Sequence, residues 1–121
     1  MTVPRDDETK NMPPLSPQVF HILVALAGGD QHGYAIMQEV AERSGGKVQL
    51  GPGTIYGMIK RLLEQGWIVE LRRQERPADD DPRRRYYRLT PQGRKVAQAE
   101  VARLEASLTH ARHYGLTTKR S

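Results

Sequence analysis

The stretch GPGTIYGMIKRLLEQGWIVEL, residues 51–71, decides the fold of this 121-residue chain. Gly51-Pro52-Gly53-Thr54 opens a helix that runs to Gln65, and Gly66 is its stop. On a helical wheel its apolar side chains gather on one side, and its polar side chains and Tyr56 lie on the other. Residues 67–71 are β-prone, so the stretch predicts an amphipathic helix with an outward face, followed by a strand.

Two further helices are expected before this stretch. Ser16-Pro17 supplies an N-cap and a proline at the first helical position, and Gly28-Gly29 ends the apolar run that follows. Asp30 is the expected cap of a second helix over residues 31–44. Its apolar residues recur every three or four positions and predict one buried face, made of Tyr34, Ile36, Met37, Val40 and Ala41.

A hairpin and a long helix are expected after the stretch. Residues 86–89 form a second β-prone run, which the polar loop 72–85 joins to the first. Thr90-Pro91 repeats the cap-and-proline signal and starts a helix that runs to about His113. This order predicts a mainly α (α+β) fold, the winged helix-turn-helix. The expected parts are a disordered tail over 1–14, a winged helix-turn-helix domain over 15–89, a C-terminal dimerisation helix over 90–113 and a frayed tail over 114–121.

Composition excludes several classes of function. The chain has no cysteine, which rules out a disulfide scaffold and a Cys-ligated zinc finger. No apolar run reaches the ~18 residues of a membrane span. The first residues lack the apolar core of a secretory signal, so a cytoplasmic protein is expected. The four histidines predict no metal site, and no nucleophile–base pair or phosphate-binding loop indicates an enzyme or a cofactor.

The net charge of +5 lies entirely in the last 50 residues. Residues 1–71 sum to −2, residues 72–88 to +3 (seven Arg against four acids) and residues 89–121 to +4 (six basic residues against two Glu). A small basic domain favours a polyanionic partner, here double-stranded DNA. A near-neutral third helix beside a basic hairpin predicts specific contacts at the helix and phosphate attraction at the hairpin.

Residues of the third helix are the first candidates for DNA contact, because the second helix of a helix-turn-helix motif enters the major groove by its N-terminal residues. The outward face offers hydroxyls, cations and a glycine that permits close approach. The candidates are Thr54, Tyr56, Gly57, Lys60 and Arg61. An ordinary solvated helix face is the alternative.

The hairpin supplies the second set of candidates. Its arginines can follow a phosphate backbone or enter a narrow minor groove. Those most favoured for contact are Arg72, Arg73, Arg83, Arg84 and Arg85, with Arg76 and Arg88 close by. A solvated loop whose charge is neutralised by Glu75 and the three aspartates at 79–81 is the alternative.

The fourth helix carries an apolar seam at alternating spacings of four and three, made of Ala97, Val101, Leu104, Leu108 and Ala111. This is the a/d pattern of a coiled coil over two heptads. Pairing with a second copy would bury the seam and predicts a homodimer. Packing on the chain's own first helix is the alternative, and both arrangements can hold together.

Three motifs in order resemble the PadR family of bacterial transcriptional regulators over about residues 15–110. They are HGYAI at 32–36, GTIY at 53–56 leading to RLLEQGWI at 61–68, and RYYRLTPQG at 85–93. A single C-terminal helix is similar to the small PadR subfamily. The resemblance implies a homodimer through the fourth helix, assisted by the first, that binds a palindromic operator with two winged helices, usually as a repressor. It also implies DNA contacts by Tyr34, Thr54, Tyr56 and Lys60, with wing arginines in the minor groove.

Some small members of that family bind flat aromatic drugs between tryptophans of the dimer-interface helices. Here Trp67 begins the hairpin and the fourth helix has no tryptophan, so a pocket of that kind is not predicted. A small-molecule effector that releases DNA remains compatible with a dimeric repressor. The alternative is a winged helix used for protein–protein contact, which the near-neutral third helix and the acidic run 79–81 favour.

Overall fold

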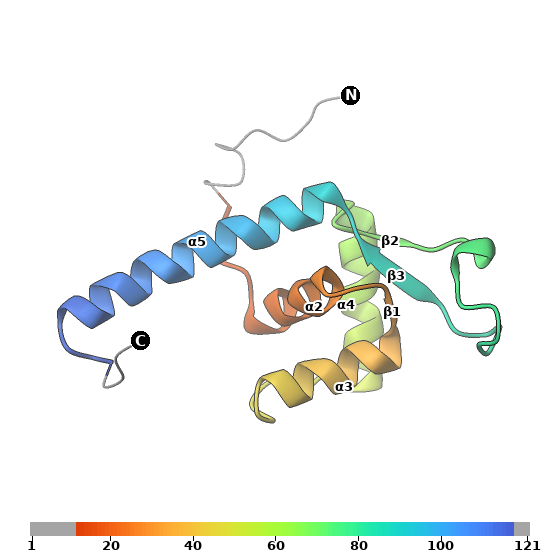
Figure 1. The fold of residues 1–121 in the computed structure, drawn as a ribbon, viewed down its shortest axis with the longest axis horizontal. Helices are drawn as coiled ribbons and strands as arrows, with labels where there is room; N and C mark the ends of the chain where they lie inside the picture. The colour runs from red at the N-terminus through yellow and green to blue at the C-terminus, as the bar shows by residue number, and fades with distance from the viewer. Residues whose placement is uncertain (1–11, 118–121) are drawn as a thin grey trace.

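Three helices form the head of the molecule, and local sequence signals set the start of the first and the end of the third. The computed structural model describes residues 12–117 and contains α2 over Pro17–Ala27, α3 over Gly33–Arg43 and α4 over Pro52–Gln65 (Figure 1). The Ser16 hydroxyl caps α2 by accepting from the amide of Val19 at 3.2 Å. Gly66 ends α4 at a φ of 77°, in the left-handed region that favours glycine.

The start of α3 differs from the expectation. His32, not Asp30, is the N-cap, and its Nδ1 accepts from the amide of Ala35 at 3.2 Å. Gln31 belongs to a short strand and not to the helix, and the carboxylate of Asp30 forms an ion pair with Arg88. The expected cap was therefore two residues early.

Tyr34 does not belong to the buried face predicted for this helix. Its side chain is 57% exposed, whereas Ile36 and Val40 are buried. Tyr34 lies two positions before Ile36, which places it on the other side of an α-helix. The prediction of a buried Tyr34 was wrong.

The sheet has three antiparallel strands where a two-stranded hairpin was expected. They are β1 over Gln31–His32, β2 over Ile68–Glu70 and β3 over Tyr86–Leu89, in the order β1-β3-β2. His32 pairs with Tyr86, and Ile68 pairs with Leu89. We call residues 68–89 the wing and residues 71–85 the wing loop; the loop contains a short 3-10 helix, η1 over Arg73–Glu75.

The core lies where α2, α3, α4 and the first half of α5 meet the sheet. It contains Ile22, Leu23, Leu26, Ile36, Val40, Leu50, Ile55, Ile59, Leu62, Trp67, Ile68, Tyr87, Val96 and Ala97. Met12 and Leu15 pack against its edge, although residues 12–14 were expected within a disordered tail. Residues 1–11 and 118–121 of the two expected tails lie outside the described residues.

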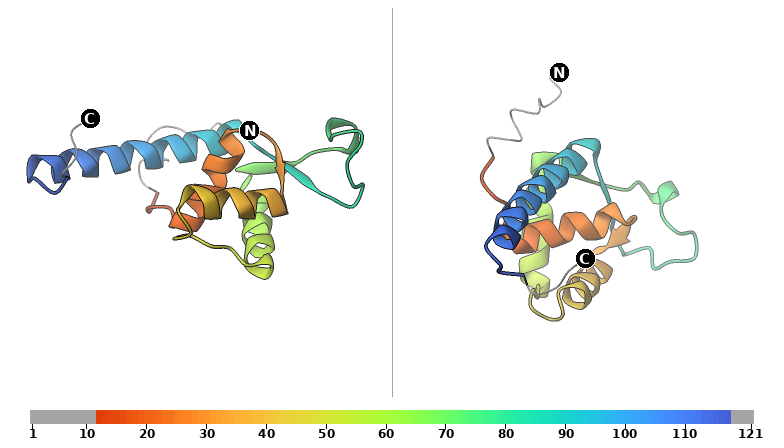
Figure 2. Two further views of the ribbon diagram at one scale, coloured as in Figure 1. Left: turned by 60° about the horizontal axis from the view of Figure 1, so that its bottom comes forward. Right: turned by 60° about the vertical axis from the view of Figure 1, so that its left-hand side comes forward.

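Helix α5, over Pro91–His113, is locked to the turn that follows α4. The Thr90 hydroxyl accepts from the amide of Gly93 at 3.0 Å and donates to the carbonyl of Gly66 at 2.7 Å. The first half of α5 packs on α2, and the second half extends away from the head (Figure 2). The winged helix-turn-helix with a long C-terminal helix is thus confirmed.

Candidate nucleic-acid interface

Helix α4 presents the outward face that the sequence predicts. Ile55, Ile59 and Leu62 are buried and hold the helix against the core. The candidate contact residues are all exposed on its other side, namely Thr54, Tyr56, Gly57, Lys60 and Arg61. An added Cβ at Gly57 would meet nothing within 4 Å, so the backbone itself is accessible there.

Tyr34 and Tyr56 come from different helices and border one hollow of ≈ 380 Å³ at the base of the wing. The hollow is lined by His32, Gly33, Tyr34, Tyr56, Arg83, Arg84, Arg85 and Tyr87. Both tyrosines are more than half exposed, so part of each side chain is open to a ligand. The hollow thus brings together five candidate contact residues from α3, α4 and the wing loop, namely Tyr34, Tyr56, Arg83, Arg84 and Arg85.

Gly33 determines how closely Tyr56 approaches α3. A Cβ built at Gly33 would lie 3.1–3.3 Å from three atoms of the Tyr56 side chain, including its hydroxyl oxygen. Real Cβ atoms rarely come so close to a neighbour, so the glycine leaves the space in which Tyr56 lies. The HGYAI motif at 32–36 contains Gly33, but the reason for a glycine at this position is visible only in its close contact with Tyr56.

Two of the seven hairpin arginines make contacts that connect separate segments of the chain. Arg76 donates to the carbonyls of Leu71 (3.3 Å) and Arg84 (3.0 Å) and to the carboxylate of Glu70 (3.3 Å). Arg88 makes two hydrogen bonds to Asp30, of 3.0 and 2.8 Å, and so ties β3 to the loop between α2 and β1. These two arginines hold the wing to its own loop and to the head.

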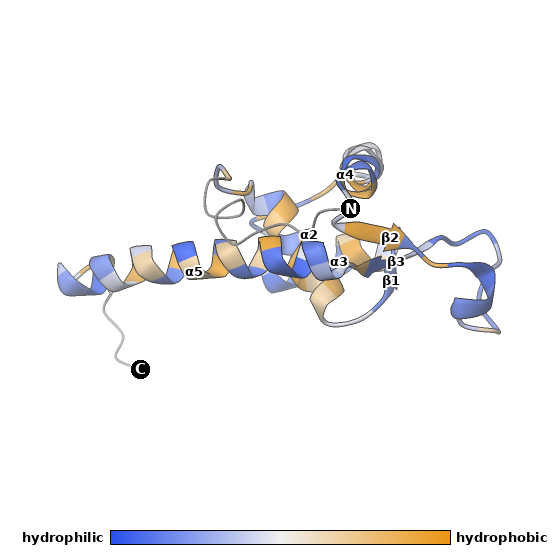
Figure 3. Ribbon diagram, turned by 90° about the horizontal axis from the view of Figure 1, so that it is seen from above, coloured by the Kyte–Doolittle hydropathy of each residue, from blue (hydrophilic) through white to orange (hydrophobic). Residues whose placement is uncertain are grey.

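The five arginines favoured for contact are exposed on the wing, but most also contact acids of the chain. Arg72 lies 3.5 Å from Glu75, and Arg85 lies 3.5 Å from Glu70. Arg83 and Arg84 pair more closely with Asp81 and Asp80, and no ion pair of Arg73 occurs among residues 12–117. Beyond the buried Leu71 at its start, the wing loop is mostly hydrophilic (Figure 3).

Asp80 and Asp81 shape the tip of the wing loop. Asp80 accepts from the hydroxyl of Tyr86, and this bond holds the pKa of its carboxyl below the usual value. Asp81 accepts from the guanidinium and the amide of Arg83, which lowers the pKa of its carboxyl in turn. Both groups are therefore carboxylates at neutral pH.

His32 links the wing to the start of α3. Its ring packs edge-on against Tyr86, with centroids 5.3 Å apart. Burial lowers the pKa of His32 below its usual value, and the positive charge of Arg84 lowers it further. The neutral ring fits its role as a cap, because Nδ1 must stay unprotonated to accept from Ala35.

The seam of α5 divides into two parts. Ala97 is buried in the chain's own core, as the packing alternative anticipated for this part of the helix. Val101, Leu104 and Leu108 are 39–41% exposed, and Ala111 is half-buried. The outer half of the seam therefore offers apolar side chains to solvent along a projecting helix (Figure 3).

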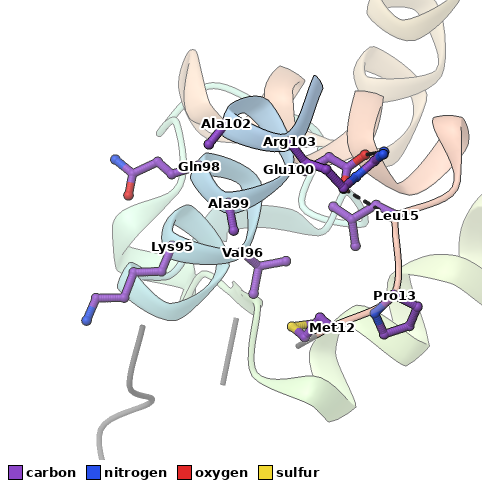
Figure 4. Close-up of a pocket in the computed structure, with 10 residues that line it drawn as sticks. All are labelled: Met12, Pro13, Leu15, Lys95, Val96, Gln98, Ala99, Glu100, Ala102 and Arg103. Carbon is purple, nitrogen blue, oxygen red and sulfur yellow. Dashed lines mark hydrogen bonds and ion pairs between the residues drawn. The ribbon is translucent and has the colours of Figure 1, made fainter. Parts of the chain in front are cut away.

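Glu100 is a buried acid that the sequence analysis missed. It accepts from the amide of Leu15 at 3.2 Å and pairs with Arg103, which lowers the pKa of its carboxyl (Figure 4). It lies beside a hollow of ≈ 440 Å³ between α5 and residues 12–15. Its spacing from Val96, one helical turn earlier on the buried face, was the only available signal.

Neither a metal-binding cluster of side chains nor a membrane-spanning helix is found among residues 12–117. No three His, Asp or Glu side chains among residues 12–117 come close enough together to hold a metal ion. None of the helices in that range combines the length and apolar character needed to cross a bilayer.

Comparisons with known proteins agree with this architecture. Over 80 residues, 66% of this chain, the sequence is 39% identical to a 37.1 kDa protein of transposon TN4556 from Streptomyces fradiae, of which it spans 21%. A PadR family transcription regulator from Clostridium difficile R20291 shares the fold, with 24% identity, a TM-score of 0.68 and coverage of 82% of this chain and 98% of that one.

A third similar protein has been solved in complex with DNA. The fold is shared by Bacillus subtilis PadR in complex with operator DNA, with 23% identity, a TM-score of 0.59 and coverage of 71% of this chain and 46% of that one. The model of the PadR-like family of transcriptional regulators matches residues 22–99, which is more than half of the chain. The chain therefore belongs to the PadR-like family of transcriptional regulators.

Proposed function

We propose that this protein binds double-stranded DNA through α4 and the wing, and that it represses transcription as a homodimer on a palindromic operator. The observation that carries the DNA contact is the hollow shared by Tyr34, Tyr56 and Arg83–Arg85. Hydroxyls and guanidinium groups are suitable donors to phosphates and base edges. The solved complex of Bacillus subtilis PadR with operator DNA supports the choice of ligand.

The DNA contact is tested by selecting bound fragments from the source genome and measuring their affinity by gel shift. Replacing Tyr56 and Lys60 by Ala should weaken binding of a selected fragment, since both side chains are exposed on the outward face of α4, the helix expected to enter the major groove. Glu64→Ala, on the same helix but farther from its N-terminus, is the control. Unchanged binding by the double variant would contradict the assignment of α4.

The homodimer is supported by the outer seam of α5, because Val101, Leu104 and Leu108 remain 39–41% exposed. Leu104→Glu with Leu108→Glu should convert a dimer into a monomer in sedimentation. Gln98→Glu with Thr109→Glu adds the same charge at exposed positions off the seam and should leave the dimer intact. A double-leucine variant that still sediments as a dimer would overturn this part of the proposal.

A small-molecule effector that releases DNA is supported by the hollow beside α5, whose walls include Met12, Leu15 and Val96. The test is a thermal-shift screen of small molecules against the full chain. An effector should raise the melting temperature and lower the affinity for the selected fragment. A screen without any stabilising compound would contradict this part.

A protein partner is the second candidate, favoured by the ion pairs that already engage Arg83 and Arg84 within the chain. It predicts that no genomic fragment is enriched even at low salt. It also predicts that a stable complex with one protein is recovered and is lost with Tyr56→Ala.

A further inference from the structure

The acidic run Asp79-Asp80-Asp81 is the part of the wing loop that the proposed function leaves unexplained, because it carries the same sign of charge as DNA. Two of its members each hold one arginine. Asp80 accepts from Nη1 of Arg84 at 2.8 Å. Asp81 accepts from Nε and Nη2 of Arg83 at 3.2 and 3.1 Å. These contacts are made by two of the arginines assigned above to DNA.

We propose that Asp80 and Asp81 are positioning residues that occupy, in the protein without DNA, the places of two phosphates on Arg84 and Arg83. DNA displaces them, so they set the affinity of the wing. This inference rests on the proposed DNA contact. A carboxylate offers a guanidinium the same paired oxygen acceptors as a phosphate, which is why one can stand in for the other.

Asp80 holds Arg84 beside the hollow that contains the two exposed tyrosines. Its second oxygen accepts from the hydroxyl of Tyr86, a residue of β3. The Tyr86 ring in turn packs against His32 at the start of α3. Arg84 is therefore held at the rim of the hollow that Tyr34 and Tyr56 border.

Asp81 holds Arg83 in a more exposed position. Its Oδ1 also accepts from the backbone amide of Arg83 at 2.9 Å, which fixes the turn. The Arg83 side chain is 89% exposed, so water surrounds the pair. Exposed ion pairs are weak, and a phosphate can therefore replace the carboxylate without unfolding the loop.

The exchange has a specific effect on salt dependence. An arginine that reaches a phosphate releases a cation condensed on DNA, which makes binding fall with salt. If the arginine leaves a carboxylate behind, that carboxylate takes up a cation again and cancels part of the release. The wild-type protein should therefore show a shallower salt dependence than its number of phosphate contacts implies.

The experiment compares three single variants, Asp79→Asn, Asp80→Asn and Asp81→Asn, on one non-specific duplex over a series of salt concentrations. Asn keeps an oxygen that can accept from Tyr86 or from the amide of Arg83. Asp79 is exposed and makes no ion pair with residues 12–117, so its variant reports the change of net charge alone. It is the matched control.

Asp80→Asn and Asp81→Asn should each tighten binding by about twofold to fivefold relative to Asp79→Asn, the range expected for removing one exposed ion pair. Each should also steepen the plot of log affinity against log salt, by at most about 0.9 per exchanged arginine, the value for complete release of one cation. In an Arg84→Ala background, Asp80→Asn should change the slope no more than Asp79→Asn does.

Equal slopes for all three variants would overturn the inference. If Asp81→Asn fails to fold, Asp81→Ser replaces it, because a serine hydroxyl can still accept from the amide of Arg83. A wild-type protein that binds no duplex at low salt would overturn the proposed function instead. The two failures are thus distinguishable.

Discussion

At the scale of single residues, the contact between Gly33 and Tyr56 predicts a coupled effect on DNA binding. A methyl group at Gly33 would come within 3.1–3.3 Å of the Tyr56 side chain, which must then shift by a few tenths of an ångström from its place in the hollow. Gly33→Ala should therefore weaken binding of the selected fragment by about fivefold, the equivalent of ~1 kcal/mol of side-chain strain.

A double-mutant cycle measures this coupling by gel shift. In a Tyr56→Ala background, Gly33→Ala should have no further effect, because the ring it displaces is gone. Gly28→Ala is the control, since its Cβ would meet only the carbonyl of Ala25 at 3.4 Å. Equal losses in both backgrounds would mean that Gly33 acts through something other than Tyr56.

His32 predicts a loss of stability in mild acid. Its pKa in the folded protein is lowered from 6.5, so the unfolded chain binds its proton first as the pH falls. The contribution of His32 is complete above pH 6.5 and decreases as the pH falls from there toward the lowered pKa. His32→Asn retains a capping acceptor that does not titrate.

The check is urea unfolding at about pH 7.5 and about pH 5.5, on either side of the usual pKa of histidine. From the higher to the lower pH, the free energy of unfolding should fall more for the wild-type protein than for the His32→Asn variant. The other histidines are present in both proteins and cancel in this difference. A difference of zero would contradict the capping role of the neutral ring.

Residue types and spacing identified the exposed candidates on α4, but not the partners that fix the wing. Asp30 and Arg88 are 58 positions apart, so no local pattern could pair them. Tyr34 was predicted buried because it was grouped with the apolar residues that recur every three or four positions, while the family resemblance implied a DNA contact by Tyr34. The role of each of these side chains depends on which elements meet, and that is known only from the fold.

At the scale of elements, Gly93 near the start of α5 leaves no room for added volume. A Cβ at Gly93 would lie 2.0 Å from the carbonyl oxygen of Trp67 and 2.9 Å from Cδ1 of Leu89. Gly93→Ala must push α5 off the turn after α4, which should lower the free energy of unfolding by about 1–3 kcal/mol or more.

Urea unfolding monitored by circular dichroism measures that loss. Gly57→Ala is the opposite case, because its Cβ meets nothing and α4 gains a better helix former. It should stabilise the protein by about 0.5–1 kcal/mol. A Gly93→Ala variant as stable as the wild-type protein would contradict this prediction, because it would show that α5 and the turn after α4 can move apart without loss of stability.

The main elements were predictable because their caps and periods are strong. Ser16-Pro17 and Thr90-Pro91 mark the starts of α2 and α5, and Gly66 marks the end of α4. Strand β1 was missed because two residues are too few to show a period. It exists only because β3 supplies its hydrogen-bonding partner.

At the scale of the whole molecule, the extension of α5 away from the head predicts that dimerisation fixes the distance between two recognition helices. In a two-fold dimer that distance must match half-sites about one helical turn of DNA, or a multiple of it, apart. Inserting five base pairs between the half-sites of a selected palindrome rotates one half-site to the opposite side of the duplex. A rigid dimer then holds only one half-site at a time.

Binding to the lengthened palindrome should weaken by about 100-fold or more, because the advantage of an intramolecular second contact is lost. Leu104→Glu with Leu108→Glu should bind both palindromes equally and weakly, since a monomer cannot sense their spacing. Gln98→Glu with Thr109→Glu should retain the discrimination of the wild-type protein. Fluorescence anisotropy with the two duplexes gives all of these affinities, and a wild-type protein indifferent to the insertion would contradict a rigid dimer built on α5.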